Sequence, residues 1–240
     1  EQRPEDVEAL TNLGLALARS GKPDEGRTQL TTALELAPGH LGASLNLSLI
    51  LLEEADPAGA LQTVDRALVW QPAERQLLEL RANALTALGR PAEAAATWRS
   101  VVEAAAADPQ PLVRWATALM QAGDHAQALT VLRRGVSTFP EDTLLLATLA
   151  WQLATAPDAA LRNGEESVSL ARRLAQANPG SAQAQDVLAT ALAEAGDWAG
   201  AVAAAEGAVA ALQAEDPAGD HIRARLVAFR EGRPFRQELP

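Results

Sequence analysis

The sequence contains no cysteine, no tyrosine and only one lysine, Lys22, among its 240 residues. Without cysteine it has no disulfide, no thiolate zinc site and no thiol nucleophile. No apolar run approaches the roughly 20 residues that a membrane-spanning helix needs, so we expect no membrane insertion within this chain. The formal net charge of −11 repels phosphate backbones, which argues against nucleic acid as a partner.

The chain begins with Glu1 and not with Met, so the sequence is either processed or an excerpt. The compartment stays open on this evidence. The lack of cysteine and the start without Met favour a location outside the cytoplasm.

Similar segments recur every 34 residues, which makes an internal repeat the main feature of the sequence. Residues 12–38 and 187–212 show the pattern clearly. A large and a small residue open each segment, a leucine follows, a glycine comes four residues later, and another small residue comes five after that. The matching positions are Leu13, Gly14, Leu17, Gly21 and Gly26 in the first segment and Leu188, Ala189, Leu192, Gly196 and Ala201 in the second.

Each repeat predicts two helices. Apolar residues at i, i+4 and i+7 give each helix one buried stripe. The glycine between the helices permits the positive φ of a helix C-cap, and the small residues let the helices approach closely. One helix pair cannot bury its apolar face alone, so neighbouring pairs must stack. The predicted repeats are 7–40, 41–74, 75–108, 109–142, 143–181 and 182–215.

These residues resemble the tetratricopeptide repeat family, whose large-small-large spacing, turn glycine and closing proline all occur in order. The resemblance covers about nine-tenths of the chain. It implies a single all-α domain over residues 1–240, a right-handed α-solenoid of six helical hairpins with a capping helix. Two positions depart from the family pattern: Ala55 replaces a turn glycine, and Arg81 replaces a large apolar residue.

The fifth repeat is five residues longer than the others, and the extra residues fall at 155–164 between its two helices. Pro157 and Gly164 predict a loop there, and Asn163 is a candidate N-cap for the following helix. We consider two roles, a tolerated insertion and a lip that touches a partner. The sequence around this insertion resembles the C-terminal end of many bacterial tetratricopeptide proteins, some of which carry the array behind a membrane or secreted enzyme.

The two ends of the chain have different patterns. Ile222, Leu226 and Phe229 form one apolar stripe, which predicts a helix in 216–240 that caps the last repeat, with arginines on its other side. We expect the tail beyond it to be frayed or held by a partner. At the other end, Pro4 is typical of a helix start.

The sequence shows no motif of an enzyme. The three histidines, His40, His125 and His221, lie in separate repeats, and none has a second ligand one helical turn away. There is no glycine-rich phosphate loop and no G-x-S-x-G nucleophile motif. We therefore expect a noncatalytic protein without a cofactor or metal.

The resemblance also implies a concave groove, lined by the first helix of each repeat, that holds proteins or peptides. Asn12, Asn46, Asn83 and Arg114 are the only groove residues suited to a carboxylate, and no lysine is near, which disfavours a carboxylate clamp. Trp70, Trp98, Trp115 and Trp198 fall at packing positions and are predicted to be core. The predicted groove residues are Leu15, Leu45, Leu49, Leu52, Glu79, Asn83, Arg114, Thr117, Met120 and Trp151.

Three functions fit this sequence. The first is a scaffold that binds a protein or peptide in an apolar-flanked groove. The second is a structural protein that assembles with itself, head to tail, into an oligomer or filament. The third is an accessory C-terminal domain of a larger membrane or secreted enzyme.

Overall fold

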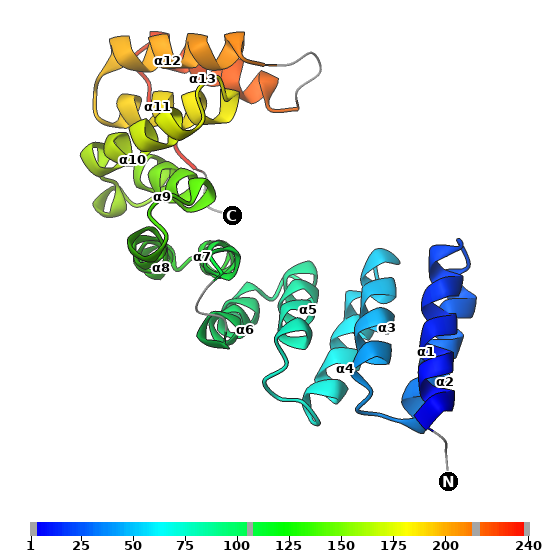
Figure 1. Ribbon diagram of the computed structural model, residues 1–240. Helices are drawn as coiled ribbons and strands as arrows, with labels where there is room; N and C mark the ends of the chain where they lie inside the picture. Colours follow the sequence, from blue (N-terminus) through cyan, green and yellow to red (C-terminus); the bar gives the residue numbers. More distant parts are fainter. Residues whose placement is uncertain (1–3, 105–107, 213–216, 238–240) are drawn as a thin grey trace. The chain divides into compact units, whose positions relative to one another are not determined.

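The computed structural model describes residues 4–104, 108–212 and 217–237. Within those residues the chain forms thirteen α-helices, one short 3-10 helix and no strand, so the all-α prediction is confirmed (Figure 1). The helices are α1 (Pro4–Arg19), α2 (Pro23–Leu36), α3 (Leu41–Glu53), α4 (Pro57–Leu68), α5 (Arg75–Ala87), α6 (Pro91–Ala104), α7 (Gln110–Gln121), α8 (His125–Thr138), α9 (Thr143–Thr155), the 3-10 helix η1 (Ala159–Leu161), α10 (Gly164–Ala177), α11 (Ala182–Glu194), α12 (Trp198–Ala210) and α13 (Gly219–Arg230).

The chain divides into two compact units, unit 1 (residues 1–118) and unit 2 (residues 119–240), and the division falls inside α7. In unit 1, α1 packs on α2, α3 on α4 and α5 on α6, while α3 also contacts α1 and α5. In unit 2, α9 packs on α10 and α11 on α12, and α9 contacts α11. These five helix pairs correspond to predicted hairpins, and within each unit first helices also touch, α3 with α1 and α5, and α9 with α11. The third predicted repeat includes residues 105–107, and the sixth ends at 215; residues 105–107 and 213–215 lie outside the described residues.

The turns that follow α1, α3, α5, α7 and α11 each contain a residue in the left-handed conformation. Gly21 has a φ of 82°, and the N–H of Lys22 donates to the carbonyl of Leu17 at 3.0 Å, which closes the end of α1. Ala55 occupies the same place after α3 with a φ of 59°, and it is the one non-glycine residue with positive φ in the described parts of the chain. Ala55, which departs from the glycine of the family pattern, therefore forms the same turn in a backbone conformation that is strained for alanine.

Close helix contacts require the small residues of the repeat. A Cβ atom on Gly26 would lie 2.6 Å from the backbone oxygen of Gly14, so the backbones of α1 and α2 meet at this point. Leu30 and Ala33 on α2 are fully buried, as a shared core of the pair requires. The two positions predicted to be small are thus the ones where the helices touch.

Four tryptophans were predicted to be core residues, and their burial differs. Trp98 is buried at 6% exposure and belongs to the core, while Trp115 and Trp198 are half-buried. The prediction for Trp70 is wrong, because its side chain is 65% exposed. Trp70 follows the end of α4, and its side chain lies against Gly39.

Arg81 on α5 takes the place of a large apolar residue and is held by polar contacts. Its Nε donates to Asp65 on α4 at 2.8 Å, and its Nη1 donates to the hydroxyl of Thr97 on α6 at 2.7 Å. The guanidinium therefore bridges the helices on both sides of α5, and its polar groups keep partners.

The helix α13 packs on α12, and Ile222, Leu226 and Phe229 are buried in this contact, as predicted. Arg225 is one of the arginines expected on the side of this helix opposite the apolar stripe, and it is not open to solvent. Its side chain is only 12% exposed, because it forms an ion pair with Asp186 on α11.

Candidate binding surfaces

The first helices of unit 1 expose an apolar strip on α3. Leu49 is 46% exposed, while Leu45 and Leu52, one turn away on either side, are half-buried and pack against the core formed with α4 and α5. Leu15 on α1 is also half-buried. Leucines that are partly fixed by the core and partly open to solvent are typical of a contact surface.

The α5 part of this surface is polar. Glu79 accepts a hydrogen bond from Nε of Arg75 at 2.6 Å, and Nη2 of the same arginine reaches Asp108. Hydrogen bonds from Arg75 and from the backbone N–H of Gln110 hold the pKa of Asp108 below its ordinary value. Asn83 is exposed on the same helix. We call Leu15, Leu45, Leu49, Leu52, Glu79 and Asn83 the first-helix surface of unit 1.

Two further predicted groove residues of unit 1 lie on α7. Arg114 is exposed, and Thr117 is half-buried with its hydroxyl donating to the carbonyl of Val113 at 2.9 Å. The hydrogen bond of Thr117 stays within its own helix. Of these two, only Arg114 offers an open charged group to a partner.

In unit 2 the predicted groove residue Trp151 on α9 is covered by the C-terminal tail of the chain. The ring of Phe235 lies with its centroid 5.6 Å from that of Trp151, at an interplanar angle of 45°. The guanidinium carbon of Arg225 lies 5.2 Å from the Trp151 ring centroid and 5.4 Å from that of Phe235. The other predicted residue of this unit, Met120, is half-buried.

The tail continues along the end of α9. The backbone N–H of Gln237 donates to the carbonyl of Thr155 at 3.0 Å, and Nη1 of Arg236 donates to the carbonyl of Ala154 at 3.4 Å. Nη2 of Arg236 lies 2.6 Å from Oε2 of Glu194 on α11. In Figure 1 the red C-terminal segment runs from α13 back toward α9. The expectation of a frayed or partner-held tail is therefore wrong for residues 233–237, and residues 238–240 lie outside the described part.

The insertion of the fifth repeat is a loop, as Pro157 and Gly164 predicted. It also contains one 3-10 turn, η1, which the sequence did not predict. Asn163 caps α10 by accepting from the N–H of Glu166 at 3.1 Å, which confirms its predicted role. Arg162 donates to the carbonyl of Ala156 at 2.8 Å and to Oε1 of Glu194 at 3.2 Å. The loop thus positions the glutamate that also meets the tail.

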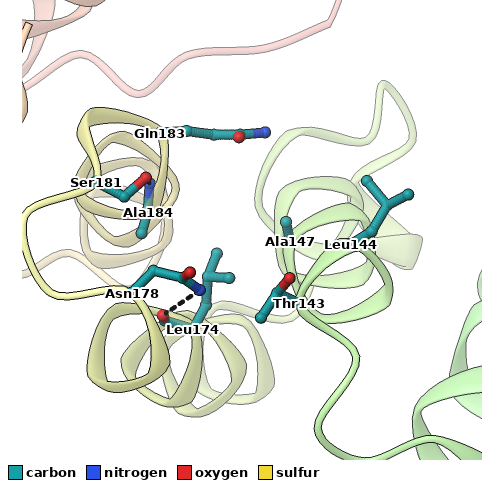
Figure 2. A pocket seen from close by; sticks show the side chains of 8 residues that line it. All are labelled: Thr143, Leu144, Ala147, Leu174, Asn178, Ser181, Gln183 and Ala184. Carbon is teal, nitrogen blue, oxygen red and sulfur yellow. Dashed lines mark hydrogen bonds between the residues drawn. The ribbon is translucent and has the colours of Figure 1, made fainter.

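Figure 2 shows a small hollow of about 140 Å³ in unit 2. The side chain of Asn178, which donates to the carbonyl of Leu174 at 3.4 Å, and that of Thr143 lie on opposite sides of it. Pockets that hold drug-sized ligands have roughly 300–1,000 Å³, so this hollow has room for one side chain only. Its lining comes from α9, α10, α11 and the turn between α10 and α11, and consists of Thr143, Leu144, Ala147, Leu174, Asn178, Ser181, Gln183 and Ala184.

The parts of the chain that the structure describes bring together no group of three or more His, Asp or Glu side chains able to hold a metal ion. No helix in those parts is both long and apolar enough to cross a membrane. His40, one of the three histidines, has a structural contact: its Nδ1 accepts from the N–H of Ala43 at the start of α3.

Two family models of the tetratricopeptide repeat match the sequence. One matches residues 1–40 and 11–75, and the other matches residues 109–151. No curated protein matches the chain.

Solved structures with the same arrangement of helices include YrrB, described as a tetratricopeptide protein with an unusual peptide-binding site. It is 18% identical, with a TM-score of 0.62, over 81% of this chain and 97% of that chain. PilF from Pseudomonas aeruginosa is 17% identical, with a TM-score of 0.64, over 92% and 97% of the two chains. MamA is 14% identical, with a TM-score of 0.60, over 70% and 89%. At these identities the likeness concerns the fold.

Proposed function

The chain is a tetratricopeptide repeat protein, and we propose that it is a noncatalytic scaffold that binds a protein or peptide segment on the first-helix surface of unit 1. The exposure of Leu49 between the half-buried Leu45 and Leu52 carries this proposal. Anchors of this kind contribute most when their base is already fixed by packing, because little conformational entropy is lost on binding.

The polar residues beside the strip suit a bound peptide backbone. Asn83 presents both a donor and an acceptor on α5. Arg114 is exposed on α7 and is a further polar group of unit 1 that a partner can reach. Glu79 is engaged by Arg75 and serves mainly to keep that arginine in place. Apolar anchors with a few polar groups beside them describe a peptide surface better than a small-molecule pocket.

The test is a selection of peptides from a displayed random library against the whole chain, followed by affinity measurements on the selected peptides. Leu49→Asp should weaken their binding by roughly tenfold or more, since it places a charge in the apolar strip. Val69→Asp is the matched control, because Val69 is 78% exposed directly after α4 and does not belong to the first-helix surface. Peptides that respond to Val69→Asp and ignore Leu49→Asp would contradict the proposal.

Self-assembly is a second candidate, favoured by Leu13. This leucine opens the first repeat and is 48% exposed, whereas Leu47, its equivalent in the second repeat, is 6% exposed. A second copy stacked on α1 would cover Leu13 in the way that a neighbouring repeat does. Light scattering across a range of concentrations, with Leu13→Asp as the variant, separates a head-to-tail assembly from a monomeric scaffold. The third candidate, an accessory domain of a larger enzyme, is tested by the full reading frame.

A further inference from the structure

The end of α9 differs from the ends of the other first helices, and the C-terminal tail donates hydrogen bonds to the carbonyls at this end. At α1, α5, α7 and α11, the residue after a left-handed glycine donates back to a carbonyl of the last turn, as Asp197 does to Leu192 at 2.9 Å. After α9 the insertion intervenes, and Asn163 donates to the carbonyl of Leu153 instead. The next two carbonyls, of Ala154 and Thr155, accept from the tail. Helix ends leave such carbonyls in need of a donor.

We propose that this part of unit 2 is a binding site for an extended segment in which an aromatic residue is followed directly by an arginine, and that the chain's own Phe235 and Arg236 are its resident occupant. We call the site the tail seat, and it consists of Trp151, Ala154, Thr155, Glu194 and Arg225. The proposal goes beyond the proposed function by assigning a second surface, in unit 2, and the chemistry of its ligand.

The aromatic half of the seat is built by Trp151 and Arg225. Arg225 is fixed in turn by Asp186, which accepts from its Nε at 2.9 Å and from its Nη2 at 2.6 Å. An aromatic ring placed there gains contact with the Trp151 ring and a cation–π contact with a guanidinium that is already immobile. A ring at this point is therefore recognised by two preformed groups.

The half of the seat that receives the arginine of the occupant is the carboxylate of Glu194. Its side chain is 14% exposed and lies between Arg162 from the insertion and Arg236 from the tail. Arg162 occupies Oε1, so Oε2 remains for a guanidinium supplied by the occupant. A charge-assisted contact at a largely buried carboxylate strongly prefers arginine to a neutral residue. The formal charge of −11 on the chain also favours a basic segment over an acidic one.

The tail is tethered close to the seat, since α13 ends at Arg230. A short tether gives an effective concentration on the order of millimolar. A segment from another molecule must compete with that concentration. The tethered tail therefore sets the minimum affinity that a competing segment needs. Only a partner with the same chemistry and further contacts displaces the tail.

The experiment uses the full chain in two forms, unaltered and with Phe235→Ala and Arg236→Ala together. The probe is the fluorescein-labelled peptide Gly-Arg-Pro-Phe-Arg-Gln, followed by fluorescence polarisation, with a control peptide that carries alanine in place of Phe and Arg. We expect the probe to bind the doubly substituted chain roughly tenfold or more tightly than the unaltered chain, because the tethered competitor is gone. The control peptide should bind neither form.

Glu194→Gln, added to the doubly substituted chain, should remove most of the probe binding. Glu206→Gln is the matched control, because Glu206 pairs with Arg230 on the surface of the same unit and should change nothing. Should the doubly substituted chain fail to fold by circular dichroism, Glu194→Gln alone serves: faster hydrogen exchange at the Gln237 amide supports the seat, and unchanged exchange overturns it.

Three results overturn the proposal. Probe binding to neither form means that the tail is only a structural cap. Equal binding to both forms places the peptide elsewhere. A concentration-dependent dimer of the unaltered chain that the double substitution abolishes means that the tail sits on a second copy. None of these results bears on the first-helix surface of unit 1, which the Leu49→Asp experiment tests separately.

Discussion

Arg225 on α13 and Asp186 on α11 form a two-point ion pair with distances of 2.9 and 2.6 Å, and both side chains are largely buried, at 12% and 9% exposure. The pair ties the capping helix to the last repeat and also holds the guanidinium that faces Trp151. Each partner depends on the other, because an isolated charge at this burial is poorly solvated.

Asp186→Ala should therefore destabilise unit 2 by about 3–5 kcal/mol, since it leaves the Arg225 charge without its partner. A cycle of the unaltered chain, Asp186→Leu, Arg225→Met and the double variant tests the pair, and the double variant should cost less than either single change. Urea unfolding of these four chains gives the coupling energy directly. Additive effects of the two single changes would show that the pair is not a unit.

The contact between α1 and α2 gives the second prediction. Gly26→Ala places a Cβ atom 2.6 Å from the backbone oxygen of Gly14, which only a separation of the helices can relieve. We expect a loss of about 1–3 kcal/mol, despite the better helix propensity of alanine. Gly207→Ala is the control, because the nearest atom to its Cβ is 3.8 Å away on Gln185. It should stabilise by about 0.5–1 kcal/mol, and the same sign for both variants would refute the packing argument.

The strained turn after α3 gives the third prediction. Ala55 adopts a φ of 59°, a conformation that costs an L residue about 1–2 kcal/mol. Ala55→Gly removes this cost and adds a smaller one from the greater freedom of the unfolded chain, so we expect a gain of about 0.5–1 kcal/mol. Gly89→Ala makes the opposite change at an equivalent turn, with a φ of 67° and no atom within 4 Å of the added Cβ. Thermal melts should move in opposite directions for the two variants.

Much of the fold could be predicted because its signals are local. The glycine turns, the small residues at helix contacts and the apolar stripe of Ile222, Leu226 and Phe229 each lie within one or two turns of sequence. Trp70 was mispredicted because the repeat spacing assumes that the second helix continues to that residue, whereas α4 ends at Leu68. The repeat spacing therefore predicts the place of a residue in the repeat better than it predicts whether the side chain is buried.

The tail seat could not be predicted, because its contacts join distant parts of the chain. The contacts of Trp151 with Phe235 and of Asp186 with Arg225 join α9 and α11 to residues from α13 onward, and α13 packs on α12. One signal was present in the sequence: the tail places a single aromatic residue between arginines, in Arg-Pro-Phe-Arg. A groove position such as Trp151 can be recognised by its place in the repeat, but its occupant cannot.

Trp151 supplies the last prediction, because it separates a binding residue from a core residue. Trp151 is half-buried, and its ring contacts Phe235 and Arg225. Trp98, in contrast, is 6% exposed within the core of unit 1. Trp151→Ala should lower stability by about 1–2 kcal/mol, less than the roughly 3–5 kcal/mol expected for Trp98→Ala. The same change should speed hydrogen exchange at Gln237 and weaken the Phe-Arg peptide in the doubly substituted chain, while Trp98→Ala should do neither. If Trp151→Ala unfolds the chain as far as Trp98→Ala does, Trp151 is a core residue and its ring does not serve the tail.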